Sequence, residues 1–413
     1  MRILHLVHSY PPCSYGGTEL HVRSIAREQA ARGNPVCIMS ATDMKDNVAD
    51  VKAEPVEGIP VLRVPWQPWE ASTVDGRNSL VRQLLQTALM EHRPDLIHLH
   101  HWSGLTSDAV LTSRNAGIPS VVSLHDYYAT CPLFHRLPGS RIPCRPDEPR
   151  DTCIRCLKTR FLVSDSDLNH ALDQRVARFR SELDHANAIL ALSGPEKTYL
   201  DRIPWLENLL IQVLPLPRPE LPAMEPPLRT PRPGGQIRLV SWGGLDPGKG
   251  LDIAVKACEV TSRPGRFSLD HFGRILDEDF RKSLTAMAVT MRLTFHGTFT
   301  EEDMVRAFPL HDLAVFPSLY METHGFVVDE ALILGLPVLV SDLGAPPERI
   351  GQQGRAFPAG DVQALARILE TILHDPDVLT RMKQGDTPPP VTLAAHMDAL
   401  MEIYEAVVRQ GPR

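Results

Sequence analysis

The chain has 413 residues, a length that suits two domains of about 200 residues each. A hydrophobic content of 43% and a charged content of 23% are those of a soluble globular protein, and a formal net charge of -7 argues against a nucleic-acid-binding surface. No run of about 18 apolar residues occurs and the N-terminus enters a short apolar segment directly, so we predict neither a membrane span nor a signal peptide. We therefore expect a cytoplasmic protein, in which seven cysteines, an odd number, do not suggest a disulfide framework.

The N-terminal segment is predicted to form a strand, a turn with two glycines and a helix. The strand covers residues 3–7, and the helix covers residues 19–32. This order is typical of the opening unit of a doubly wound α/β sheet, in which ligands bind where Gly16 and Gly17 lie. Tight packing of helix on strand explains a glycine pair about as well. The turn is not a G-x-G-x-x-G motif, so a nicotinamide dinucleotide site is not supported.

A histidine follows the central strand of this half. His125 comes at the end of the strand predicted at 120–125, and an imidazole there is placed for chemistry because its pKa lies near neutrality. His98, His100 and His101 are weaker candidates, for which a place in the core or at its rim is the favoured interpretation. The other strands predicted in this half are 36–40, 61–64, 96–100 and 188–192.

A polar, cysteine-containing insertion covers residues 127–160. It holds four cysteines, and thiolates gathered from one loop are what a tetrahedral Zn²⁺ site needs. A structural zinc site, free or partly oxidised thiols, and an iron–sulfur cluster all stay open, because the first two cysteines are too far apart for a standard zinc ribbon. The four residues are Cys131, Cys144, Cys153 and Cys156.

Basic residues gather in the same insertion and on the helix predicted after it. Such patches would suit a diphosphate-lipid acceptor or peripheral contact with the anionic inner face of a membrane, and a solvated loop is an equal alternative. The residues are Arg136, Arg141, Arg145, Arg150, Arg155, Lys158 and Arg160, then Arg175, Arg178 and Arg180.

A proline-rich segment marks the predicted domain boundary. Eight prolines between Pro215 and Gly235 indicate an extended, semi-rigid linker. We therefore predict an N-terminal domain at 1–215, a linker at 216–235 and a second domain at 236–390.

The second domain also opens on a strand and a glycine-rich turn. The strand covers residues 237–242, and Gly243 and Lys249 lie in the turn before a helix that begins near Leu251. Glycines with a lysine at a helix entrance suit a diphosphate, the lysine acting as a point charge. Later strands are predicted at 268–272, 292–296, 313–316 and 336–341.

Two carboxylates flank the start of the helix predicted at 327–334. Glu322 lies in the preceding loop and Glu330 lies within the helix, where both could accept hydrogen bonds from hydroxyls of a sugar or ribose. A helix start leaves backbone N–H groups unpaired, so the main chain at Gly325, Phe326 and Val327 could offer donors to the same ligand.

The Glu-x7-Glu spacing of Glu322 and Glu330, within Glu-Thr-His-Gly-Phe and Glu-Ala, resembles the signature of retaining GT-B glycosyltransferases of family 4, of the polysaccharide-pathway type. The Gly-Gly-x-Glu turn after the first strand and the His125-Asp126 pair are also similar to that family. The resemblance implies two Rossmann-like, doubly wound parallel-sheet α/β domains that face a central cleft. It also implies that the last helix, at 391–413, crosses back to the first domain.

The resemblance also implies roles for the site residues. The donor would be a nucleotide diphosphate sugar, with a UDP or GDP sugar favoured, and the acceptor a glycan or lipid-linked glycan near Gly16, Gly17 and His125. Glu330 would accept from the ribose, Lys249 would neutralise the leaving diphosphate, and no catalytic metal would be required. Glu322 and the main chain at 325–327 would hold the transferred sugar.

One position departs from the family pattern. Gly244 stands where the family usually has an arginine that binds the diphosphate, so its loss should weaken donor binding unless another cation replaces it. A catalytically degenerate partner subunit therefore stays open as an alternative. A nucleotide-sugar epimerase and a phosphorylase stay open too, because they could use the same fold.

Overall fold

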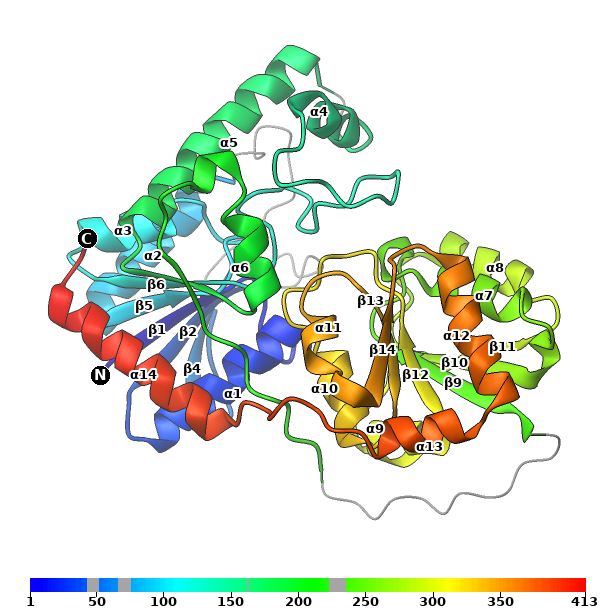
Figure 1. Ribbon diagram of the computed structural model, residues 1–413. Helices are drawn as coiled ribbons and strands as arrows, with labels where there is room; N and C mark the ends of the chain where they lie inside the picture. The colour runs from blue at the N-terminus through cyan, green and yellow to red at the C-terminus, as the bar shows by residue number, and fades with distance from the viewer. Residues whose placement is uncertain (43–51, 66–75, 162, 223–234) are drawn as a thin grey trace. The chain divides into compact units, whose positions relative to one another are not determined.

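The computed structural model describes residues 1–42, 52–65, 76–161, 163–222 and 235–413 (Figure 1). The chain divides into two compact units. The first contains Met1–Arg136, Cys144–Pro217 and Val391–Arg413, and the second contains Leu137–Pro143 and Arg218–Pro390. Most of the proline-rich segment, residues 223–234, lies outside the described residues. None of the described helices is both long enough and apolar enough to cross a bilayer.

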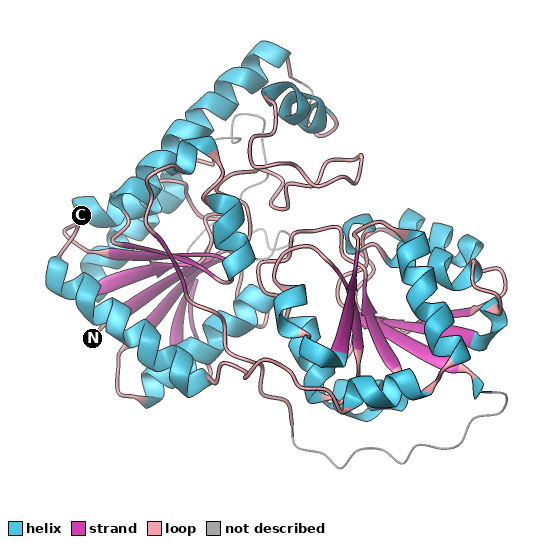
Figure 2. Ribbon diagram, in the orientation of Figure 1, coloured by secondary structure: helices cyan, strands magenta, loops and turns pink. Residues whose placement is uncertain are grey.

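The first unit is built on a sheet that is flanked by helices (Figure 2). Its strands are parallel except for β3, which runs antiparallel to β4. The strand order is β3-β4-β2-β1-β5-β6-β7-β8, so the direction of strand addition changes between β1 and β5. The carboxyl ends of these two strands are the topological switch point, where doubly wound sheets bind ligands. The strands are β1 Ile3–Val7, β2 Val36–Ala41, β3 Lys52–Val56, β4 Ile59–Val64, β5 Leu96–Leu99, β6 Ser120–Leu124, β7 Ala188–Ala191 and β8 Ile211–Val213.

The last helix of the chain belongs to this first unit. Its apolar stripe, with Met397, Leu400, Tyr404 and Val407, packs in one core with strand residues such as Val121. Positions three and four apart place these side chains on one face of the helix. The helices are α1 Gly17–Ala31, α2 Ser79–His92, α3 Ala109–Asn115, α4 Arg150–Lys158, α5 Asp165–His185, α6 Gly194–Leu200 and α14 Leu393–Gln410.

The second unit contains an all-parallel sheet in the order β11-β10-β9-β12-β13-β14, with its switch point between β9 and β12. Apolar cores cover it through α7 and α12 and through α10. Its strands are β9 Ile237–Trp242, β10 Phe267–Phe272, β11 Arg292–Phe295, β12 Leu313–Phe316, β13 Val338–Ser341 and β14 Gly354–Phe357. Its helices are α7 Leu251–Glu259, α8 Glu278–Met287, α9 Glu301–Ala307, α10 Phe326–Ile333, α11 Pro346–Arg349, α12 Val362–His374 and α13 Asp377–Lys383.

The structure confirms the predicted class of two parallel-sheet α/β domains. It adds three strands that the sequence analysis did not predict, β3, β8 and β14, because none of them is a continuous apolar run. The cysteine-containing insertion is also more regular than its composition suggested. It contains α4, which packs with α5 through a small core of Ile154, Leu157 and Leu168.

Candidate active site

In the second unit, two loops meet at the carboxyl ends of β9 and β12. The β9 loop passes through Gly243 and Gly250, both at positive φ, and the Leu319 N–H donates to the Gly248 carbonyl at 2.8 Å. A Cβ at Gly250 would lie 2.0 Å from the Pro317 carbonyl oxygen. Only glycine therefore allows the two loops to approach this closely.

Lys249 and Glu322 are brought together by this contact. The Lys249 ammonium lies 2.7 Å from Glu322 Oε1, which also accepts from the Ser318 hydroxyl at 2.9 Å. Burial opposes the lysine charge, but the Glu322 carboxylate outweighs it and raises the pKa of Lys249. Lys249 also stands over the Tyr320 ring, whose hydroxyl donates to Asp246 at 2.6 Å. The lysine is thus charged and held in place at the end of the sheet.

Glu330 lies on α10 and contacts the last residue of β9. The indole N–H of Trp242 donates to Glu330 Oε2 at 2.5 Å. Burial raises the pKa of Glu330 to about 7, against the opposing effect of this hydrogen bond. Glu330 therefore changes charge near neutral pH.

The start of α10 is braced by side chains that the sequence analysis did not select. Gly325 occupies the N-cap at φ 82°, a left-handed conformation that favours glycine. His324 Nε2 and Arg349 Nε lie 3.1 and 3.0 Å from the buried Asp329 carboxylate. These contacts fix the turn that presents the main chain of Phe326 and Val327. The His-x4-Asp spacing of His324 and Asp329 could have predicted their contact from the sequence. The contact with Arg349 could not be predicted in this way, because Arg349 lies on a separate helix.

Gly244 has room for a larger side chain only if a neighbour moves. A Cβ there would lie 2.7 Å from Cδ1 of Leu276, an exposed and flexible side chain. The glycine is therefore not required by backbone packing.

In the first unit, the β1 loop places Glu19 beside a histidine. Gly16 is the N-cap of α1 and Gly17 its first residue, and the buried Glu19 carboxylate lies 3.4 Å from His8 Nε2. Burial opposes the carboxylate charge, but His8 lowers the pKa of Glu19 to about 2. A Cβ at Gly16 would meet Glu19 Oε2 at 2.6 Å, so this glycine makes room for the carboxylate.

The predicted His125 lies directly after β6 and is buried within a group of histidines. Its Nε2 is 3.0 Å from His100 Nδ1, and the neighbouring Asp126 is 3.0 Å from His101 Nε2. Burial lowers the pKa of His125 to about 3, so the ring is neutral at pH 7. His98, His100 and His101 are buried as well, which agrees with the prediction that they lie in the core or at its rim.

Three of the four cysteines of the insertion lie near one another. Burial raises the pKa of Cys144, to about 12, and that of Cys153, and the neighbouring Cys131 adds to both shifts. Among the described residues, no group of three ligand atoms within 4.8 Å of one another includes a thiol. The zinc site stays a prediction, and metal analysis of the purified protein is its test.

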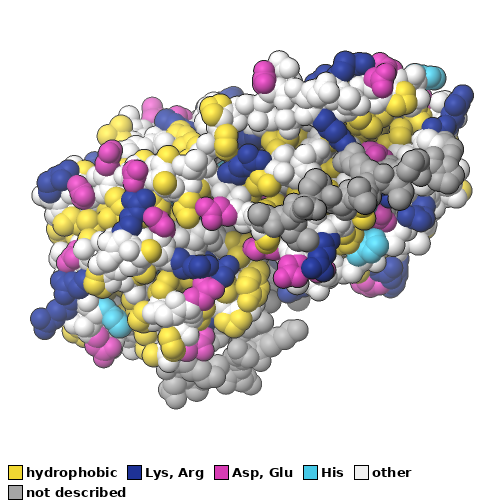
Figure 3. Space-filling view, turned by 90° about the horizontal axis from the view of Figure 1, so that it is seen from below, with side chains coloured by type: hydrophobic (Ala, Val, Ile, Leu, Met, Phe, Trp, Pro, Cys, Tyr) yellow, Lys and Arg dark blue, Asp and Glu magenta, His cyan; other side chains and the backbone are white. Residues whose placement is uncertain are grey.

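Two residues of the predicted basic patch are not on the surface. Arg136 and Arg175 are buried, and Arg136 donates to the Tyr199 hydroxyl at 2.7 Å while Arg175 donates to the Tyr128 carbonyl. They hold the insertion and α5 in place and cannot contact an acidic surface, which corrects that part of the prediction. On the face in Figure 3, basic side chains lie among acidic ones.

Two doubly wound α/β units with loops at their switch points define a class of ligand-binding proteins, and comparisons with known proteins show the family. Residues 15–216 match the family model Glycosyltransferase Family 4, and residues 236–375 match Glycosyl transferases group 1. The two units thus carry these two glycosyltransferase family domains, and the chain has the GT-B fold.

Relatives and solved structures agree with this assignment. The D-inositol 3-phosphate glycosyltransferase of Rhodococcus erythropolis is 23% identical over 389 residues, covering 89% of this chain and 80% of that protein. The amylovoran biosynthesis glycosyltransferase AmsK of Erwinia amylovora is 29% identical over 182 residues, 41% of this chain and 42% of AmsK. Several relatives are thus matched over less than half of their own length. The crystal structure of Anabaena HepE in complex with UDP and glucose superposes with a TM-score of 0.63 at 19% identity, covering 98% of this chain and all of HepE.

Proposed function

We propose that the protein is a retaining glycosyltransferase that moves a sugar from a nucleotide diphosphate sugar to a glycan or lipid-linked glycan, in the synthesis of a cell-surface polysaccharide. The observation that carries this proposal is the Lys249–Glu322 ion pair at the carboxyl ends of β9 and β12. The crystallised HepE binds UDP and glucose, and AmsK takes part in amylovoran biosynthesis, which supports the donor class and the pathway type.

The charges of the second unit suit such a donor. Lys249 Nζ would neutralise the diphosphate as it leaves, as a fixed cation that needs no reorganisation during the reaction. Glu322 would then accept hydrogen bonds from hydroxyls of the transferred sugar, and Glu330 from the ribose. The main chain at 325–327, at the start of α10, would add N–H donors.

The mechanism we propose follows from these charges. With Lys249 and the helix start stabilising the leaving group, the acceptor hydroxyl attacks from the face that the leaving group occupies. The departing phosphate takes the acceptor proton, and the sugar keeps its anomeric configuration. Neither Lys249 nor the helix start requires a metal ion for this role.

A panel of UDP, GDP and ADP sugars tests the donor class by thermal shift. A bound donor at 100 times its dissociation constant adds about 2.7 kcal/mol of stability. We expect Lys249→Met to abolish the shift, and the exposed Lys282→Met to leave it intact. Transfer from a labelled donor to an acceptor glycan then tests the reaction.

Other outcomes would select another function. No stabilisation by any nucleotide sugar or nucleotide would favour a degenerate partner subunit. An epimerised sugar formed without acceptor would favour an epimerase, and a requirement for free phosphate a phosphorylase.

A further inference from the structure

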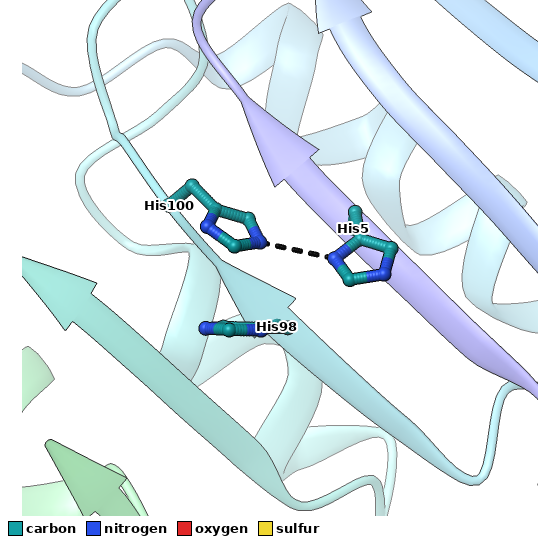
Figure 4. A group of neighbouring side chains, drawn as sticks. All are labelled: His5, His98 and His100. Carbon is teal, nitrogen blue, oxygen red and sulfur yellow. Dashed lines mark hydrogen bonds between the residues drawn. The ribbon is translucent and has the colours of Figure 1, made fainter. Parts of the chain in front are cut away.

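Buried histidines in the first unit form a continuous chain of hydrogen bonds that ends at His125. His5 lies on β1, His98 and His100 come from β5 and the residue after it, and all three are at most 1% exposed (Figure 4). His5 Nδ1 lies 3.0 Å from His100 Nε2, and His100 Nδ1 lies 3.0 Å from His125 Nε2. Three neighbouring parallel strands thus contribute one imidazole each to a single line.

The other end of this chain is an amide. His5 Nε2 lies 2.7 Å from Oε1 of Gln29, a fully buried residue on α1. The amide oxygen thus faces His5, while the amide nitrogen has no hydrogen-bond partner among the described residues.

An amide oxygen can only accept, and this sets the direction of the whole chain. His5 must carry its proton on Nε2, which leaves a lone pair on Nδ1. His100 Nε2 must then donate to His5, and His125 Nε2 must donate to His100. Burial keeps the rings neutral, with the pKa of His5 lowered to about 4 and that of His125 to about 3. Each neutral ring holds one proton, so with the Gln29 oxygen as the acceptor the three rings donate in this one direction.

We propose that Gln29, acting through His5 and His100, fixes the tautomer of His125, so that His125 Nδ1 meets its ligand as a hydrogen-bond acceptor. Gln29, His5 and His100 are positioning residues in this proposal. The identity of the ligand, a hydroxyl of the sugar or acceptor, rests on the proposed function, whereas the tautomer does not. Because the Gln29 amide cannot take up a proton, the chain locks a tautomer and does not conduct protons out of the site.

A metal ion is the competing use of these rings. Nitrogen atoms of His5, His98 and His100 lie within 4.8 Å of one another, as do those of His21, His100 and His125. In the first group, however, both nitrogens of every ring already have a partner. His98 contacts the Tyr404 hydroxyl at 2.5 Å and the Ser123 hydroxyl at 2.8 Å, and a metal would have to break such contacts. The hydrogen-bond chain therefore accounts for the cluster better.

Nitrogen-15 NMR of histidine-labelled full-length protein measures the tautomer directly, without any need for activity. We expect His125 to show a protonated Nε2 and a bare Nδ1, its signals being assigned by their loss in His125→Asn. A protonated Nδ1 of His125 in the unmodified protein would overturn the proposal.

Variants at Gln29 test the cause. Gln29→Met removes the acceptor, and because a buried N–H without a partner is costlier than a bare lone pair, the chain should reverse and protonate His125 Nδ1. Gln29→Glu keeps an acceptor and should restore the original tautomer. Ser123→Ala, which removes a buried hydroxyl beside His98 but outside the chain, is the matched control and should leave the tautomer unchanged.

Activity gives a separate readout. Gln29→Met should lower turnover about tenfold, the value of one neutral hydrogen bond, with nucleotide affinity unchanged. If Gln29→Met reverses the tautomer of His125 but leaves turnover unchanged, the role of His125 Nδ1 as acceptor is overturned. If neither the unmodified protein nor any variant shows transferase activity, the result counts against the proposed function alone. One equivalent of transition metal in untagged protein, lost in His5→Gln, would overturn the hydrogen-bond chain.

Discussion

Gly244 is the residue at which this protein departs most clearly from the pattern its sequence resembles. It faces Leu276, and its backbone is not in the left-handed conformation that would require glycine. An arginine there would have to displace only a flexible leucine. The backbone at Gly244 therefore does not explain why this position lacks an arginine.

We predict that Gly244→Arg combined with Leu276→Ala tightens the binding of the donor nucleotide by about tenfold, because hydrogen bonds to charged groups contribute about 1.5–3 kcal/mol. Calorimetry with the nucleotide identified in the panel measures the change, with Leu276→Ala alone as the control. Equal affinity of the two variants would contradict the prediction.

Glu330 makes a second prediction at this scale. Its pKa of about 7 means that the accepting carboxylate form increases as pH rises from 6 to 8. Donor affinity should therefore increase about tenfold over that range, the change expected for one group with this pKa. Glu330→Gln should remove the pH dependence, whereas Glu402→Gln on the exposed face of α14 should keep it. A flat profile in the unmodified protein would contradict the assignment of Glu330 to the ribose.

At the scale of elements, α14 is important because it is remote in sequence from the sheet on which it packs. Leu400 is fully buried in the core that includes Ile3 and Val121. Tyr404 on the same face contacts His98, so the helix also supports the histidine cluster.

Leu400→Ala should lower the free energy of unfolding by about 2–5 kcal/mol, the range for a buried leucine replaced by alanine. Denaturant unfolding of the full chain measures this, and Glu402→Ala on the exposed face should change stability by less than about 0.5 kcal/mol. Similar stabilities of the two variants would show that α14 does not contribute to the core.

Elements were predicted well where the sequence carries a continuous apolar run. The strands β1, β9 and β12 lie at the predicted positions because each is buried on both faces. The strand β14, Gly354–Phe357, has no such run and is held by its pairing with β13, a contact that local sequence does not contain.

At the scale of the whole molecule, the buried histidines determine how stability depends on pH. The pKa of His5 and of His271 is lowered to about 4, and that of His125 to about 3, in each case first by burial. Below pH 6.5 the unfolded chain binds protons that the folded protein does not, so stability rises with pH across this range. His8 opposes this trend, because its raised pKa contributes stability that is present below 6.5 and lost as pH rises through its folded value. Glu330 opposes it as well, because burial raises its pKa from 4.5 to about 7 and the stability of its protonated form is lost as pH rises through that range.

The melting temperature should therefore fall as pH decreases from 6.5 to about 4, with each neutral buried histidine contributing up to about 1.4 kcal/mol per pH unit. His271→Met in the second unit should reduce the acid slope by about one proton. Scanning calorimetry at a series of pH values measures both. A melting temperature unchanged between pH 6.5 and 4.5 would contradict the buried, neutral state of these rings.

The sequence by itself determined the class of fold, the pair of carboxylates and the lysine, because apolar runs, glycine turns and residue spacing are local properties. Only the tertiary structure decided that Lys249 pairs with Glu322, that Arg136 and Arg175 are buried, and that Gln29 reaches His125 through two other rings. These contacts join residues from different strands and helices. Their burial changes charge and protonation, and burial depends on how the whole chain packs.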